Sequence, residues 1–159
     1  MRPSVIGFAL SMLVLSSLPA WSAAPWTGAT ADDLAAWMKS AGYDAEVKPS
    51  AYEGEHYLES RVDGQEFDIF LADCRADGQC GSLTFFFYLD AGIERLRNVE
   101  KWGRYRTIKI LHDDTGFYAQ MQLSLADFPN GLATGFAAWG SELPELLKVM
   151  AAPVEPVAR

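Results

Sequence analysis

The middle of the chain is dominated by short segments in which apolar and polar residues alternate. A period of two residues is typical of a β-strand with one buried face. The pattern predicts strands at Tyr43–Lys48, His56–Val62, Gln65–Ala72 and Cys80–Leu89. Asp63-Gly64 predicts a tight hairpin turn between the second and third of these strands, because such turns need residues that tolerate positive φ.

The strand expected at Cys80–Leu89 differs from the others because it is apolar on both faces. Leu83, Phe85 and Phe87 point one way, and Phe86 and Tyr88 point the other. Such a strand belongs in the middle of a sheet or under cover on both sides.

Three segments show helical spacing. Ala31–Ala41 carries apolar residues at every third or fourth position, Thr30 and Asp33 have the spacing of a capping box, and Gly42 is placed for a left-handed C-cap. Ile93–Trp102 has an apolar face of its own. Leu132–Met150 also follows three- and four-residue steps, although Pro144 predicts a kink or break there.

Two further strands are expected at Arg106–Leu111 and Phe117–Leu125, joined by a turn at Asp113-Asp114-Thr115-Gly116. The order of elements is therefore α-β-β-β-β-α-β-β-α. Runs of antiparallel strands with separate helices predict a two-layer α+β fold, an antiparallel sheet with helices packed on one side.

The first residues have the layout of a secretory signal peptide. Arg2 precedes an apolar run at Val5–Leu18, and small residues at Ala20 and Ser22 place a cleavage site before Ala23. A membrane anchor is the alternative, but the run is shorter than the roughly 20 residues of a bilayer span. We therefore expect a signal peptide over 1–22, a domain over 29–150, a flexible tail over 151–159, and a periplasmic or secreted protein.

Charge narrows the classes of partner. The chain has 13 basic and 21 acidic residues among 159, and loss of Arg2 with the signal peptide leaves 12 − 21 = −9. That sign opposes non-specific binding to nucleic acid or anionic lipid. The net negative charge is compatible with a basic partner, and a requirement for solubility alone also explains this charge.

Cys74 and Cys80, the two cysteines of the chain, flank the turn before the Cys80–Leu89 strand. Facing residues of a hairpin are close enough for a disulfide, which an oxidising compartment favours. A redox pair would favour CxxC spacing at a helix N-terminus, and a metal site would need further ligands, for which the chain offers only His56 and His112. A structural disulfide is the leading interpretation; switchable thiols and a metal remain the alternatives.

No pattern of catalytic residues emerges. His56 and His112 could each act as a general base, but no nucleophile or carboxylate lies at a diagnostic spacing. Trp102, Arg104, Tyr105 and Arg106 form a small basic-aromatic patch. Such residues are frequent at binding hot spots, so the patch is a candidate partner site, with local packing as the alternative.

The ordered set of segments resembles the bacterial YbjN-domain family in an exported version. The resemblance covers about residues 29–150 and rests on TADDLAAWMKSAGYDAEV, RVDGQEFDIFLADC, QCGSLTFFFYLD, LHDDTGFYAQMQLSL and GLATGFAAWGSELPELL. A family motif with an asparagine before a basic-aromatic step is matched only loosely by Asn98 and Arg104-Tyr105.

The resemblance implies a fold similar to that of type III secretion chaperones, which bind proteins and are often dimers. Family members are described as regulators of sensory transduction and have no established catalytic residues. We therefore expect a non-catalytic protein-binding or regulatory module without a cofactor. The alternative is an acidic inhibitor or immunity-type protein that binds a basic partner.

Overall fold

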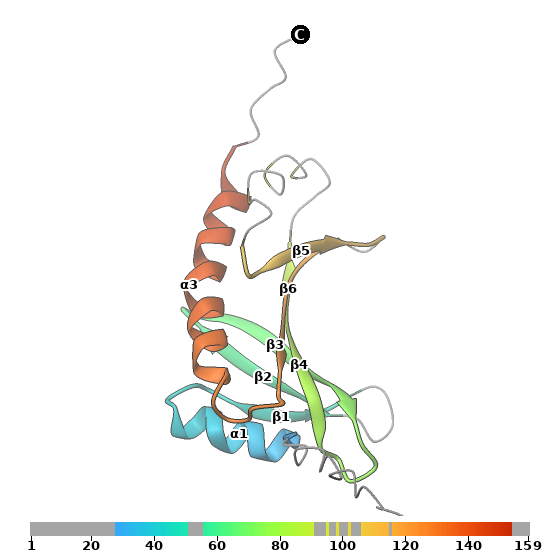
Figure 1. Ribbon diagram of the computed structural model, residues 1–159. Helices are drawn as coiled ribbons and strands as arrows, with labels where there is room; N and C mark the ends of the chain where they lie inside the picture. The colour runs from blue at the N-terminus through green and yellow to red at the C-terminus, as the bar shows by residue number, and fades with distance from the viewer. Residues whose placement is uncertain are drawn as a thin grey trace, which may run out of the picture.

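The computed structural model describes residues 28–50, 56–90, 95, 98, 102, 106–114 and 116–153. In chain order the elements are α1 (Ala31–Ser40), β1 (Glu46–Pro49), β2 (His56–Val62), β3 (Gln65–Cys74), β4 (Cys80–Leu89), β5 (Lys109–His112), β6 (Phe117–Ser124) and α3 (Leu132–Ala151) (Figure 1). This part of the chain is an α+β fold, as the sequence predicts. The signal peptide expected over 1–22 lies outside the described residues, as does most of the helix expected at Ile93–Trp102.

The six strands form one open sheet in the order β1-β2-β3-β4-β6-β5, and every neighbouring pair is antiparallel. The strand that is apolar on both faces, β4, lies inside the sheet between β3 and β6, as predicted. Both edge strands, β1 and β5, are short, and β1 ends at Pro49. Short edges and an edge proline limit unwanted strand pairing.

The local signals at the turn and the first helix are confirmed. Asp63 and Gly64 have φ of 49° and 80°, which gives the predicted hairpin turn between β2 and β3. At α1, the Thr30 hydroxyl accepts a hydrogen bond from the Asp33 amide at 3.1 Å, and the Asp33 carboxylate accepts one from the Thr30 amide at 3.1 Å. The Thr30 hydroxyl also donates a hydrogen bond of 2.7 Å to the Asp33 carboxylate, and this bond, with the one from the Thr30 amide, lowers the pKa of Asp33. Gly42 ends the helix at φ 86°, as expected for a left-handed cap.

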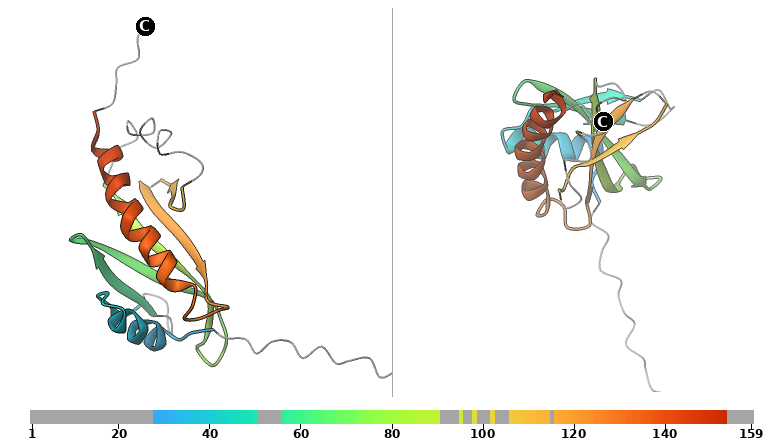
Figure 2. Two further views of the ribbon diagram at one scale, coloured as in Figure 1. Left: turned by 60° about the vertical axis from the view of Figure 1, so that its left-hand side comes forward. Right: turned by 90° about the horizontal axis from the view of Figure 1, so that it is seen from above.

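The core lies between one face of the sheet and the two described helices. A row of cross-strand neighbours, Val47–Leu58–Ile69–Phe85–Met121, points into it. Phe85 packs against Trp139 and Phe136 of α3 with ring centroids 5.2 and 4.8 Å apart, and Trp37 of α1 reaches Phe136 at 5.3 Å. Both helices therefore cover the same face, and Figure 2 shows α3 lying along the sheet with α1 near its end.

Helix α3 continues through Pro144 without the break that the sequence suggests. Leu143 and Leu146, on either side of the proline, are fully buried. Packing of these leucines in the core stabilises the helix on both sides of the missing backbone donor. At its C-terminus, the carbonyl of Ala152 accepts a hydrogen bond of 2.9 Å from Nδ2 of Asn98.

Two glycines of α3 differ in the space beside them, which gives a matched prediction. A Cβ at Gly140 would meet only Val62 at 3.4 Å, whereas a Cβ at Gly135 would clash with the Leu123 side chain, with Cδ2 at 2.9 Å. Alanine in a helix interior is favoured over glycine by about 1 kcal/mol. We expect Gly140→Ala to raise the free energy of unfolding by about 0.5–1 kcal/mol, and urea denaturation measures it.

Gly135→Ala gains the same free energy of helix propensity, but the new methyl group must displace the Leu123 side chain. Overpacking of this kind costs about 1–3 kcal/mol. We expect it to be less stable than Gly140→Ala by at least about 1 kcal/mol. Equal stability of the two variants would show that the packing of α3 on β6 is looser than described.

Candidate docking surface

The face of the sheet opposite the helices carries a line of aromatic side chains, here called the aromatic stripe: Tyr57, Phe70, Phe86 and Tyr118, with Tyr88 beside it. They come from β2, β3, β4 and β6. Consecutive strand residues point to opposite faces, so Phe86 points outward because Phe85 points into the core. The stripe is thus fixed by the same register that builds the core.

The rings of the stripe contact one another across the strands. Tyr57 and Phe70 are cross-strand partners with centroids 5.5 Å apart, Phe70 meets Phe86 at 6.0 Å, and Phe86 meets Tyr118 at 4.9 Å. Tyr88 pairs with Tyr118 in the register. Cross-strand aromatic pairs stabilise a sheet by a fraction of a kcal/mol each, roughly 0.2–1.

The stripe is partly open to solvent: Tyr57, Phe86 and Tyr118 are half-buried, and Phe70 is exposed. Phe70 is 40% exposed, Tyr88 52%, and Leu111, the β5 neighbour of Tyr118, 41%. These three are the exposed large apolar side chains of the described residues, and all lie on this face. Single exposed apolar residues are ordinary, but a contiguous apolar group on a sheet face is typical of an interaction site.

Carboxylates flank the stripe on the side toward β1. One outward row of cross-strand neighbours runs Glu46–Glu59–Asp68–Phe86. Lys48 Nζ lies 2.7 Å from Glu46 Oε1 and 3.2 Å from Glu59 Oε2, and these bonds raise the pKa of Lys48. Lys48 therefore neutralises part of the row.

Asp68 is the carboxylate next to the stripe. Burial raises its pKa, and the negative charge of Glu59 across the strand raises it further. Among the described residues, Asp68 has no hydrogen bond or ion pair. Like charges directly opposite one another on a sheet are unfavourable, so the Glu59–Asp68 pair does not stabilise the fold.

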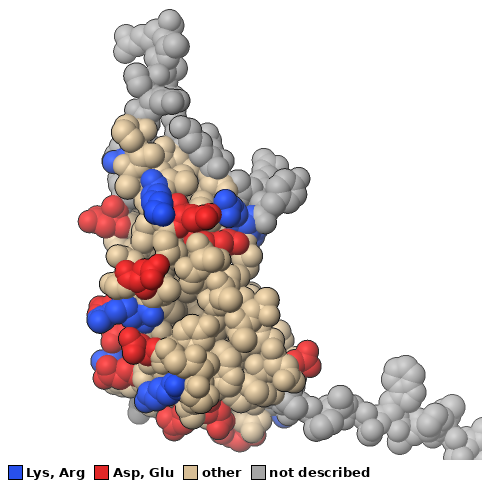
Figure 3. Space-filling view, turned by 90° about the vertical axis from the view of Figure 1, so that its left-hand side faces the viewer, with Lys and Arg blue, Asp and Glu red and all other residues tan. Residues whose placement is uncertain are grey.

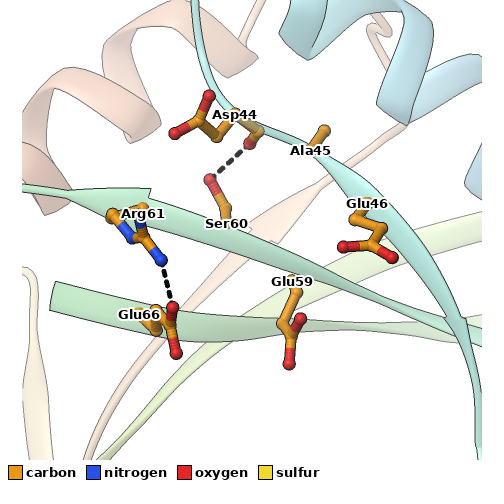
Figure 4. Close-up of a pocket in the computed structure, with 7 residues that line it drawn as sticks. All are labelled: Asp44, Ala45, Glu46, Glu59, Ser60, Arg61 and Glu66. Carbon is orange, nitrogen blue, oxygen red and sulfur yellow. Dashed lines mark hydrogen bonds and ion pairs between the residues drawn. The ribbon is translucent and has the colours of Figure 1, made fainter. Parts of the chain in front are cut away.

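A cavity of about 300 Å³ lies where β1 begins to pair with β2, and we call it the acidic pocket (Figure 4). Its walls are Asp44, Ala45, Glu46, Glu59, Ser60, Arg61 and Glu66. Arg61 pairs with Glu66, and the Ser60 hydroxyl donates a hydrogen bond to the Asp44 carbonyl at 2.7 Å. The walls thus hold four carboxylates and one guanidinium, and Lys48 bonds two of the carboxylates, Glu46 and Glu59. Glu59 belongs both to the pocket and to the outward row.

The side of the molecule that carries α3 has a different charge pattern. Basic and acidic side chains are interspersed there (Figure 3). One of its ion pairs joins Arg106 to Glu145 at 3.1 Å. The walls of the acidic pocket, in contrast, hold four carboxylates and one guanidinium.

Cys74 and Cys80, predicted to be joined, form a disulfide with the sulfurs 2.08 Å apart. They are cross-strand partners, Cys74 as the last residue of β3 and Cys80 as the first residue of β4. A second cavity of about 420 Å³ beside them includes His56, Asp32 and Arg75 in its walls. His112 lies at the other edge of the sheet, in β5, so the structure does not bring the two histidines together. Among the described residues, no three His, Cys, Asp or Glu side chains are grouped to hold a metal ion.

The basic-aromatic patch is described only in part, because Arg104 and Tyr105 lie outside the described residues. Trp102 is buried, and its Nε1 donates a hydrogen bond to the Ile108 carbonyl at 3.0 Å. The Arg106 guanidinium lies 4.9 Å from the centre of the Trp102 ring. For Trp102 these contacts favour the local-packing alternative.

Comparisons with protein-family models, with curated proteins and with solved structures found no match to this chain. Within the described part of the chain, neither helix has the length and apolar character needed to cross a bilayer.

Proposed function

We propose that the chain is a small exported protein-binding module, related to the YbjN-domain family, that docks a partner on the open face of its sheet. The observation that carries the proposal is the aromatic stripe, a contiguous apolar group held at the surface by four strands. Aromatic side chains supply much of the binding energy at protein interfaces. A regulatory or chaperone-like role without catalysis fits such a surface.

The disulfide supports the exported part of the proposal. Disulfides persist in oxidising compartments such as the periplasm and the medium, and Cys74 and Cys80 are paired. The signal-peptide pattern before Ala23 points in the same direction. Family membership rests on the sequence segments quoted above, which fall on α1, the β2–β3 hairpin, β4, β6 and α3.

One observation favours the second candidate function, an inhibitor or immunity-type protein for a basic target. The carboxylates of the acidic pocket gather on one side of the molecule, as such a protein requires. Binding would then depend strongly on salt, because exposed charges are screened within about 10 Å at 0.1 M salt. In the first candidate function, partner binding depends mainly on the aromatic stripe and is therefore less sensitive to salt.

Affinity capture from a bacterial envelope extract tests the proposal. The immobilised mature protein is expected to retain a defined protein, and Phe70→Ser with Tyr88→Ser is expected to reduce recovery by at least about 30-fold, since a hot spot is worth 2 kcal/mol or more. Ala133→Ser with Ala137→Ser, on the exposed side of α3, is the matched control and should leave recovery unchanged.

Equal recovery by both variants would rule out the sheet face as the docking surface. Recovery of no protein, together with turnover in a broad hydrolase screen, would replace a binding function with an enzymatic one. Loss of that turnover in His56→Ala or His112→Ala would then identify the catalytic histidine.

A further inference from the structure

We propose that the partner presents a cationic side chain beside apolar ones, with the apolar groups on the aromatic stripe and the cation between Asp68 and the acidic pocket. This inference rests on the proposed function, because it specifies the chemistry of the partner for the same surface. It commits to a protein segment that carries lysine or arginine next to aromatic or aliphatic residues.

The two parts of this surface are continuous. Glu59 lines the acidic pocket, its cross-strand partner is Asp68, and the cross-strand partner of Asp68 is Phe86 in the stripe. Adjacent strands are about 4.8 Å apart, so the backbones of Glu59 and Phe86, two strands apart, are separated by about 10 Å across the sheet. On an extended segment, side chains on one face are about 7 Å apart at a spacing of two residues and about 13 Å apart at a spacing of four, and two turns of a helix span about 11 Å, so either kind of segment can cover this distance.

The charges of the row are not balanced by the described residues. Lys48 bonds Glu46 and Glu59, and Arg61 pairs with Glu66, which leaves Asp68 without a cation. Burial and the neighbouring Glu59 raise the pKa of Asp68, so ionisation of Asp68 costs more free energy than ionisation of a free aspartate side chain. A partner's lysine or arginine would remove that penalty, because an opposite charge favours the ionised carboxylate.

Other classes of occupant fit less well. Nucleic acid and anionic lipid carry the same sign of charge as the acidic pocket. A second copy docked face to face would bring a second set of the same carboxylates to the surface. Charge complementarity therefore selects a cationic protein segment.

Selection from a library of displayed random peptides tests the inference without knowledge of the partner. Immobilised mature protein is the bait, with three variants alongside. Glu59→Gln with Asp68→Asn removes two charges and keeps the side-chain shapes, Phe70→Ser with Tyr88→Ser removes the exposed rings, and Asp32→Asn with Asp127→Asn removes two exposed charges elsewhere.

Peptides selected on the unmodified protein are expected to be enriched in lysine or arginine adjacent to aromatic or aliphatic residues. Their affinity should fall about tenfold with the Glu59/Asp68 variant, as expected for loss of about 1.4 kcal/mol, and should not change with the Asp32/Asp127 control. Peptides selected on the Glu59/Asp68 variant should keep the apolar residues and lose the cationic enrichment.

Two kinds of failure are distinguishable. Peptides that depend on Phe70 and Tyr88 but show no cationic enrichment would overturn this inference and leave the proposed function standing. Peptides whose binding ignores Phe70 and Tyr88, or a library that yields no binder, would overturn both. A dimer in sedimentation that Phe70→Ser with Tyr88→Ser dissociates would show that a second copy occupies the surface, which also overturns this inference.

Discussion

Replacing Phe85 with alanine is expected to lower the free energy of unfolding by about 3–5 kcal/mol. Phe85 is fully buried and contacts Trp139, Phe136 and Phe67, the last with ring centroids 5.8 Å apart. Its removal takes away the apolar area of a phenyl ring and leaves a cavity where the sheet meets α3. Chemical denaturation of the mature protein, with the midpoint and the slope both fitted, measures the loss.

Phe70 is the matched control, since it has the same side chain one strand away on the opposite face of the sheet. It is 40% exposed and makes two cross-strand aromatic contacts, so Phe70→Ala should cost no more than about 2 kcal/mol. A similar loss for both variants would mean that the outward face is packed against something in the folded protein. The contrast also bears on function, because an aromatic residue with little effect on stability needs another reason to be at the surface.

Removing the disulfide is expected to lower stability by about 2–3 kcal/mol, the chain-entropy value for a short closed loop. Cys74 and Cys80 are separated by six positions in the sequence, and the Cys80 backbone also exchanges two hydrogen bonds with Ala29, of 2.9 and 3.1 Å. Loss of the covalent link therefore loosens both the β3–β4 turn and the segment that leads into α1. Denaturation of Cys74→Ala with Cys80→Ala, compared with the oxidised protein, measures the effect.

A reducing agent provides the control for this prediction. It should destabilise the unmodified protein by a similar amount and leave the double variant unchanged. Two alkylatable thiols in mature protein isolated from the cell envelope would contradict the structural role of this pair.

Features of the fold that depend on neighbours in the sequence could be predicted well. The capping box at Thr30, the left-handed Gly42 and the Asp63-Gly64 turn follow from a few adjacent residues whose backbone preferences agree. The interior position of β4 in the sheet could also be predicted, because the sequence of this strand is apolar on both faces. The placement of β6 between β4 and β5 could not be derived, since strand order is decided by long-range packing.

The candidate site was harder to predict than the fold. The sequence pointed to the histidines, the cysteines and the patch at Trp102 as candidate sites. It did not predict the aromatic stripe. Its four members lie on four strands, and only the register shows that Tyr57, Phe70 and Phe86 meet. The sequence feature that could have predicted the stripe is an aromatic residue at an outward position of each of these four strands, where a polar residue is usual.

Site-specific photocrosslinking tests the docking surface most directly. A photoreactive phenylalanine analogue would replace Phe70, on the open face, or Ala137, on the exposed side of α3, in protein exported by living bacteria. We expect a discrete crosslinked species from position 70 and none from position 137. Crosslinking from position 137 alone would contradict the assignment of the open sheet face as the docking surface.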